Sequence, residues 1–238
     1  MARVLTEPER VDPGRMRRIV DFLELRRPEL QVLALLFIAA DLFLMLAYLY
    51  FRLESPESWP WDIRSEHGLG ERYQSLKQFW CVVVLGVLWV RRRSFVVFAW
   101  AVVMAYYLVD DSRRIHERMS VYLVEQVDLG ISTSVGEFIW YAAVGATLIL
   151  LVALGYRRAD EVTKRLSRKI AGYFVALIVC GVALDFLHDP FVEIVPIDIA
   201  LTFLEDGGEQ VILSALTAFL ICQILPGGDR RAGPSSTV

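Results

Sequence analysis

Six long apolar stretches constrain the fold of this 238-residue chain more than any other feature. A helix needs roughly 20 apolar residues to cross a bilayer core of about 30 Å, and each stretch approaches that length. Hydrophobic residues make up 55% of the chain and the mean hydropathy is +0.45, which is too apolar for an ordinary soluble domain. The predicted spans are residues 31–51, 73–90, 94–111, 137–156, 170–188 and 208–225. The predicted fold is therefore all-α, a polytopic membrane protein folded as a single six-transmembrane-helix bundle.

The charged residues divide unevenly between the two sides of these spans. Segments on the amino-terminal side carry 18 of the 25 Lys and Arg residues, whereas the opposite side carries 18 of the 28 Asp and Glu residues. Because basic loops stay in the cytoplasm, both termini are predicted to be cytoplasmic, in a multi-pass protein of the cell inner membrane. The run Arg91–Arg93 is predicted to form a tight inner turn, so spans two and three are expected to be antiparallel neighbours.

Terminal segments flank the predicted transmembrane domain of residues 31–225. Residues 1–30 are predicted to be cytoplasmic, with a short basic amphipathic helix at 15–27 that lies on the inner membrane surface rather than on nucleic acid. Residues 226–238, rich in Gly, Pro and Ser, are predicted to be a disordered cytoplasmic tail. Membrane lipids are the predicted partners, and the oligomeric state stays open.

Several classes of site are absent from the sequence. It contains no GxGxxG, P-loop, GxSxG or HExxH pattern, so nothing indicates nucleotide or flavin binding. Its three cysteines, Cys81, Cys180 and Cys222, fall in predicted spans without CxxC spacing, which argues against disulfides and against a thiolate metal site. Buried apolar packing is the favoured interpretation of these cysteines.

Each histidine lies next to carboxylates at the outer end of the predicted bundle. The three are His67, His116 and His188. Spans three and five end on this side, where the negative pole of the helix dipole disfavours acids, yet Asp110, Asp111 and Asp185 lie there. A cation is therefore expected to compensate them. Carboxylate and imidazole ligands favour one or two ions of Fe, Mn or Zn.

Helical spacing selects the predicted metal ligands. Asp185 and His188 share a helix face at i, i+3, as in the carboxylate-x-x-His pairs of di-iron bundles. Asp111 and His116 are five residues apart and would align only through a π-bulge or a helix break, which we expect here. The full predicted ligand set is Asp111, His116, Asp185, His188, Glu205, Asp206 and Glu209.

Helix capping is the competing interpretation for part of the outer acids. Ser134-Val135-Gly136-Glu137 is typical of a capping box, and capping is favoured for Glu137. Asp206-Gly207-Gly208-Glu209 fits a second box at the start of span six. For the acids of that segment, capping and metal binding both stay open.

Two charged residues fall within the predicted spans. Asp41 lies in the middle of the first span, where an ionisable group costs at least about 2.5–3.5 kcal/mol on insertion scales. It is expected to point into the bundle and to bond a hydroxyl or stay protonated, with a proton-path role as the alternative. Lys77 lies near the start of the second span and is expected to snorkel to the interface.

The segment from Leu108 to Glu117 resembles the hallmark of an uncharacterised family of bacterial six-helix membrane proteins, a motif near L-x-D-E-x-x-x-I-H-E at the end of the third span. Residues 68–77 and 204–209 are similar to two further parts of that family. This chain has Asp111 and Asp206 where the family pattern has Glu, so the carboxylates reach less far. The resemblance supports the outer site and implies no particular reaction.

Three functions remain open at this stage. One is a metal-dependent hydrolase or oxidoreductase that acts on a lipid or small amphiphile at the outer leaflet, with Glu71 as general base and Arg113 or Arg114 holding an anionic headgroup. Another is a transporter for protons or a cation. The third is a non-catalytic membrane subunit or sensor whose outer acids bind a partner or a cation.

Overall fold

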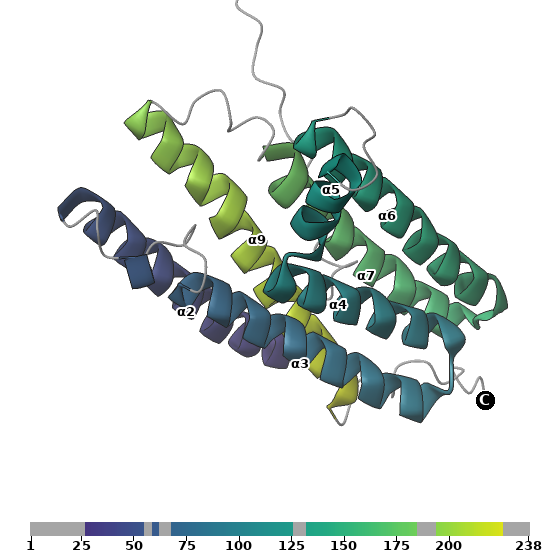
Figure 1. Ribbon diagram of the computed structural model, residues 1–238. Helices are drawn as coiled ribbons and strands as arrows, with labels where there is room; N and C mark the ends of the chain where they lie inside the picture. Colours follow the sequence, from purple (N-terminus) through teal and green to yellow (C-terminus); the bar gives the residue numbers. More distant parts are fainter. Residues whose placement is uncertain (1–26, 55–58, 62–67, 126–131, 185–193, 226–238) are drawn as a thin grey trace, which may run out of the picture.

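Every regular element in the described part of the chain is helical (Figure 1). The computed structural model describes residues 27–54, 59–61, 68–125, 132–184 and 194–225. The elements are α2 (Pro28–Glu54), η1 (Trp59–Trp61), α3 (Leu69–Arg92), α4 (Phe95–Arg113), α5 (Ile115–Glu125), α6 (Thr133–Arg158), α7 (Glu161–Ile178), η2 (Val179–Leu184) and α9 (Val195–Ile224). These ranges contain no strand, which confirms the all-α prediction.

Five of the described helices are long and apolar enough to cross a membrane: α2, α3, α4, α6 and α9. α7 and the π-helix η2 that continues it lie where the remaining span is predicted, but the first half of α7 is charged. The described residues therefore contain five candidate membrane spans, one fewer than the six that the sequence predicts. The predicted termini, residues 1–26 and 226–238, lie outside the described residues.

α7 and α9 begin two or more helical turns earlier than predicted. α7 begins at Glu161, within the predicted inner connection 157–169, because Leu166 and Ile170 supply a buried helical stripe despite the charges around them. α9 begins at Val195, within the predicted outer loop, with a proline in its first turn, where a missing N–H costs nothing. The acidic segment 205–209 consequently lies inside α9 and not at its start.

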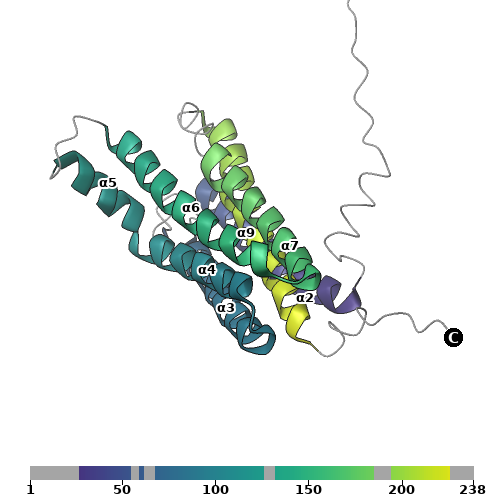
Figure 2. The same ribbon diagram turned by 90° about the vertical axis from the view of Figure 1, so that its right-hand side faces the viewer.

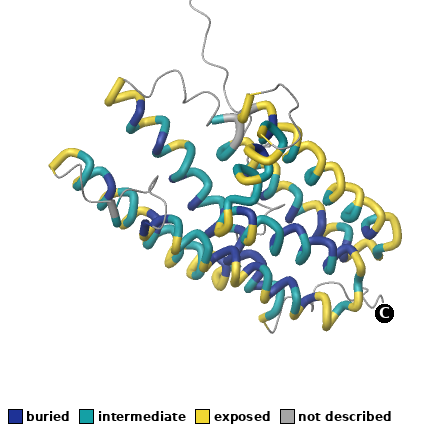
Figure 3. The backbone as a smooth tube through the Cα atoms, in the orientation of Figure 1, coloured by how far each residue is buried: buried dark blue, intermediate teal, exposed yellow. Residues whose placement is uncertain are grey.

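α9 occupies the centre of the bundle, in contact with α2, α3 and α7 (Figures 1 and 2). α4 lies against α3, α6 and α7, and α5 packs on α6. The turn between α3 and α4 is as tight as predicted: Arg93 adopts φ 50° and its N–H bonds the Trp89 carbonyl. Most of the buried residues belong to α3, α4 and α9 (Figure 3).

The apolar residues outside this core face outward. On α2, Leu35 and Leu46 are more than 60% exposed, and on α6 Phe138 and Ile149 are more than 70% exposed. Such faces suit contact with lipid chains. At the end of the bundle that is predicted to lie outside (the outer end), Trp61 of η1 stacks on Phe51 of α2 with ring centroids 5.4 Å apart, as is typical of an interfacial aromatic.

Candidate functional site

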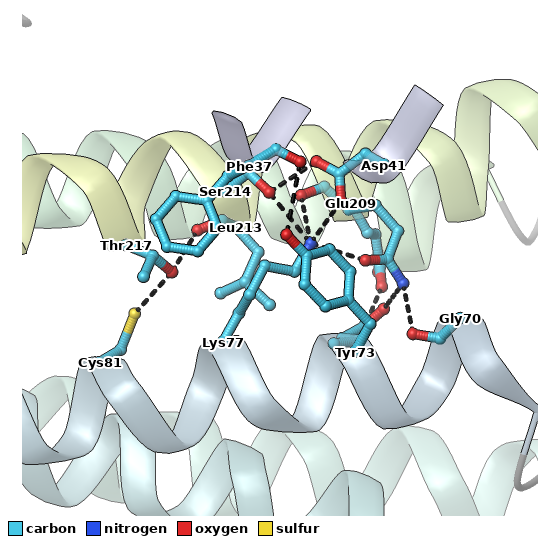
Figure 4. Close-up of polar contacts among 12 residues, drawn as sticks. Phe37, Asp41, Gly70, Tyr73, Lys77, Cys81, Glu209, Leu213, Ser214 and Thr217 are labelled. Carbon is cyan, nitrogen blue, oxygen red and sulfur yellow. Dashed lines mark hydrogen bonds and ion pairs between the residues drawn. The ribbon is translucent and has the colours of Figure 1, made fainter. Parts of the chain in front are cut away.

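A buried ion pair joins the middle of α2 to α3. The Nζ atom of Lys77 lies 2.8 Å from Oδ1 of Asp41, and neither side chain has exposed surface (Figure 4). Asp41 is 13 residues from either end of α2, about 20 Å at 1.5 Å per residue. The two charges therefore sit deep within the candidate spans. The expectation that Lys77 snorkels to the interface is wrong.

α9 supplies the remaining partners of this pair. Lys77 Nζ also donates to Oε1 and the carbonyl oxygen of Gln210, at 2.6 and 2.9 Å, and lies 3.1 Å from Ser214 Oγ. Ser214 donates to Oδ2 of Asp41, which confirms that Asp41 points inward and bonds a hydroxyl (Figure 4). The Tyr73 ring covers the ammonium, its centroid 4.5 Å away. Both charges are thus compensated by groups from three helices.

From this pair, hydrogen-bonded side chains continue toward the outer end. Gln210 Nε2 donates to Gln74 Oε1 at 2.9 Å and to the Gly70 carbonyl at 3.0 Å. Gln74 Nε2 in turn lies 3.2 Å from Glu209 Oε2 and 3.4 Å from the Tyr107 hydroxyl. The polar chain therefore reaches the outer acids without a gap.

Glu209 lies where four helical elements meet. Gln74 of α3 bonds it and also bonds Tyr107 of α4, and its carboxylate packs directly on Gly181 of η2, where any side chain would overlap it. Cys180 of η2 lies against Gly208 of α9. π-Helical turns often occur at functional sites, and this one makes room for an acid side chain inside the bundle.

Toward the inner end the polar groups stop after one helical turn. Cys81 Sγ lies 3.2 Å from Thr217 Oγ1, which donates to the Leu213 carbonyl. Beyond them the fully buried side chains of α3 and α9 are apolar, and the next polar side chain on α9 is the half-buried Gln223, whose Nε2 atom is enclosed. Leu85, Leu88, Leu216, Phe219 and Leu220 are at most 1% exposed. Cys81 and Cys222 are buried and free, in line with the packing interpretation, and Cys180 is half-buried.

The end of α4 shows the predicted break, but with a different pairing. α4 ends at Arg113, Arg114 adopts φ 51°, and α5 begins at Ile115. The reversal returns His116 to Asp110: its Nδ1 lies 3.0 Å from Oδ2 and its N–H donates to Oδ1 at 3.1 Å. His116 therefore bonds Asp110 and not Asp111, the partner that the spacing indicated, although its charge also acts on Asp111.

Aromatic groups and acids surround the His116 ring. It stacks on Tyr141 of α6, with centroids 5.0 Å apart, and Tyr106 donates to Oδ1 of Asp110. Burial lowers the pKa of His116, but the hydrogen bond and charge of Asp110, with the charges of Glu117 and Glu137, raise it more. The net effect is a raised pKa, so the imidazolium is favoured.

The other predicted site residues take separate partners. Asp111 accepts from Gln78 Nε2 at 2.8 Å, and the charge of Glu71 acts on it. Glu71 borders a shallow open hollow that Arg72, Ser75 and Ser112 also line. Arg114 pairs with Glu117 at 3.3 Å, whereas Arg113 is exposed at the end of α4. Glu205 and Asp206 are half-buried on α9.

Neither predicted capping box is formed. The N-cap of α6 is Ser132, whose Oγ accepts from the Val135 N–H at 3.4 Å. Glu137 therefore lies two residues beyond Val135, the position from which a capping box would be completed. Asp206 and Glu209 lie in the interior of α9, so capping does not explain them.

Part of the predicted metal site lies outside the described residues. Two of its ligands, Asp185 and His188, lie outside the described residues, as does His67. Within the described ranges, no three His, Cys, Asp or Glu side chains are grouped so as to hold a metal ion. Binding of Fe, Mn or Zn stays a prediction.

Sequence reasoning placed the acids at the outer end but missed the pairing of Lys77 with Asp41 and Gln210. These partners are 36 and 133 residues away along the chain, so no local spacing links them. The one available signal was an opposite charge within each of two apolar spans.

Comparison with known proteins gives one match. A family model described as a domain of unknown function, DUF8692, matches residues 68–223. It covers α3 to α9, including Lys77, His116 and Gln210, but not Asp41. The comparisons with curated proteins and with solved structures found no match.

Proposed function

The chain belongs to the DUF8692 family, and we propose that it is a proton-responsive membrane protein whose helix packing follows protonation at the Lys77–Asp41 pair. One observation carries this proposal: an ion pair without exposed surface, deep in the candidate spans, held by three helices at once. Loss or gain of one proton there leaves a single uncompensated charge. Such a charge is costly in the membrane interior, so the packing of α2, α3 and α9 is expected to respond.

Stability alone explains the pair poorly. Replacement of a buried ion pair by packed apolar residues is often neutral or stabilising, so the two charges are weak as a stabilising device. Intramembrane ionisable residues commonly mark proton or ion pathways. The polar chain through Gln210, Gln74 and Glu209 supports this interpretation.

The arrangement favours proton exchange with the outer side. Polar side chains link Lys77 to Glu209 and Tyr107. The fully buried side chains that follow Cys81 toward the inner end are apolar, and the next polar side chain on α9, Gln223, lies one residue before that helix ends. A transporter needs access from both sides. One-sided access therefore favours a sensor of outer pH over a proton transporter.

The proposal includes a six-span topology in the inner membrane with both termini in the cytoplasm. α7 with η2 supplies the sixth crossing, between the basic end of α6 and the acidic outer side. The division of charge between the two sides supports this orientation.

Distance measurements in reconstituted vesicles test the proposal. Spin labels at Leu53 on α2 and Leu204 on α9, both exposed, report the separation of the two helices while only the outer pH is changed. The wild type should show a pH-dependent distance change that Asp41→Asn and Lys77→Gln abolish. Leu85→Ala, a cavity-forming change on α3, controls for lost stability and should keep the response. A wild type without a pH response would overturn the proposal.

A metal ion at the outer end is the second candidate, and the geometry of His116 favours it. Metal-bound histidines commonly donate their second ring N–H to a carboxylate, as Nδ1 can to Asp110 here. Nε2 would then be the metal ligand, and Oε1 of Glu117 lies 3.8 Å from it. Elemental analysis of the purified chain tests this candidate. One or two Fe, Mn or Zn ions that are lost in His116→Ala and in His188→Ala would support it, and a metal-free wild type would exclude it.

A further inference from the structure

We propose that Arg165 and Arg168 of α7 bind the phosphate groups of anionic phospholipids in the inner leaflet. The inference needs the membrane crossing and orientation given above but is independent of the proton response. α7 presents a cationic patch, defined as these two arginines, on a surface that the bundle leaves uncovered.

α7 has two sharply different faces. The residues buried against the bundle are Thr163, Leu166, Ser167, Ile170, Tyr173 and Leu177. Trp100 of α4 anchors this face, because its Nε1 donates to Ser167 Oγ at 2.8 Å. The orientation of α7 about its own axis is thereby fixed, and Arg165 and Arg168 lie on the opposite, exposed side.

The exposed stripe changes character along the helix. From Arg165 and Arg168 it continues at helical spacing through Gly172 to Val175 and Val179, which are 61% and 51% exposed. The two valines suit the hydrocarbon of the membrane, and the two arginines suit the layer of headgroups. A boundary near Gly172 separates the two environments.

Contacts on either side of the patch give its depth. Lys164 Nζ lies 5.9 Å from the ring centroid of Tyr156, and Tyr156 is two residues before the end of α6. Lys169 Nζ lies 5.7 Å from the ring centroid of Phe219, and Phe219 is five residues before the end of α9. At 1.5 Å per residue these levels are about 3 and 8 Å inside the helix ends. The headgroup layer of one leaflet is about 5–8 Å thick, so the patch lies at its depth.

The patch has no bonded carboxylate among the residues that the structure describes. Within the described ranges, no ion pair or hydrogen bond involves either guanidinium group. Glu161 acts on both arginines through its charge, but its carboxylate bonds Lys164 at 2.9 Å. Arginines one turn apart present two planar donor groups, and these match phosphate oxygens in bidentate geometry. An anionic phospholipid supplies both the charge and the acceptors at this depth.

Native mass spectrometry of the full chain in detergent tests this inference, with titration of dioleoyl phosphatidylglycerol or dioleoyl phosphatidylcholine. A surface cation adds about fivefold to affinity for an anionic lipid surface, so Arg165→Gln/Arg168→Gln should weaken phosphatidylglycerol binding about 25-fold. Binding of phosphatidylcholine should stay unchanged. An unchanged melting temperature of the variant in phosphatidylcholine would show that the fold is intact.

Arg157→Gln/Arg158→Gln is the matched control. It removes the same charge from exposed residues at the end of α6, outside the proposed patch, and should keep most of the phosphatidylglycerol preference. An equal loss in both double variants would show diffuse attraction to a basic surface and would overturn the assigned site. A wild type without preference for phosphatidylglycerol would overturn it as well.

Discussion

At residue scale, the pairing of Lys77 with Asp41 shows how one interaction links three helices. The ammonium bonds groups of α2 and α9, and the carboxylate is held in turn by Ser214. Removal of either charged group leaves the other charge buried in the bundle without its ion-pair partner. The effects of removing the two charges are therefore interdependent, whereas replacing both residues by apolar ones leaves no unpaired buried charge.

This interdependence gives a stability prediction. Lys77→Met or Asp41→Leu alone should destabilise the protein by about 3–5 kcal/mol, because each leaves an unpaired buried charge. The double variant Asp41→Leu/Lys77→Met should recover most of this loss and should show no helix movement with pH. Unfolding equilibria in detergent measure all three variants. A double variant as unstable as the sum of the single changes would contradict the argument.

At element scale, the contact of α6 with α4 depends on a single glycine. A Cβ atom at Gly155 would lie 2.7 Å from Val96 Cα and 2.9 Å from Val96 N, so the two helices would have to separate. Gly145, on the same helix, has no atom within 4 Å of the corresponding position. The two glycines form a matched pair for a packing test.

Gly155→Ala should destabilise the protein by about 1–3 kcal/mol, since it overpacks a backbone contact. Gly145→Ala should be neutral or should stabilise by up to about 1 kcal/mol, because alanine favours the helix. Thermal unfolding of the two variants and the wild type separates the effects. Equal melting temperatures for the two variants would disprove the close approach of α6 to α4.

α5 is attached to α4 through the pair formed by His116 and Asp110. The pKa of His116 is raised, so the charged form contributes stability that is fully present below the unfolded-state pKa and is lost as pH rises through the folded-state pKa. Amide exchange of α5, measured with a chelator present, should therefore quicken relative to the rest of the bundle as pH rises above about 6.5, the ordinary histidine value. Asp110→Asn should make this relative exchange independent of pH, and a persistent dependence would implicate Glu117 or Glu137.

At the scale of the whole molecule, the two ends of the bundle differ in charge and in chemistry. Acids, His116 and the open end of the polar chain lie at one end. The Arg91–Arg93 turn and the basic half of α7 lie at the other. Both proposals depend on which end faces the cytoplasm.

Cysteine labelling in intact cells measures this orientation. In a background without Cys81, Cys180 and Cys222, a reporter at exposed Ser132 should react with an impermeant reagent from outside. A reporter at exposed Glu161 should react only after the membrane is permeabilised. The reverse pattern would invert the topology and with it the side of proton access.

Local sequence pattern predicted much of the architecture. Runs of about 20 apolar residues are enough to place α2, α3, α4 and α6, because hydrophobic length is a property of the segment itself. The helix break near Asp111 and the inward direction of Asp41 were also predictable. The starts of α7 and α9 were not, because burial against neighbouring helices outweighs the charges in those segments.

The partners of the charged groups depended on the tertiary structure. Sequence spacing associated His116 with Asp111 and sent Lys77 to the surface, because it registers only neighbours along one helix. The reversal at Arg114 returns His116 to Asp110 instead, and the packing of α2 and α9 on α3 surrounds Lys77 with acceptors. The sequence alone was therefore enough to predict the lengths of the apolar helices and the separation of basic and acidic residues to opposite ends of the bundle. The pairing of the charged groups is decided only when helices that are far apart in the chain pack together and exclude water. An ion pair deep in the bundle persists only if polar groups from other helices replace the water that it loses.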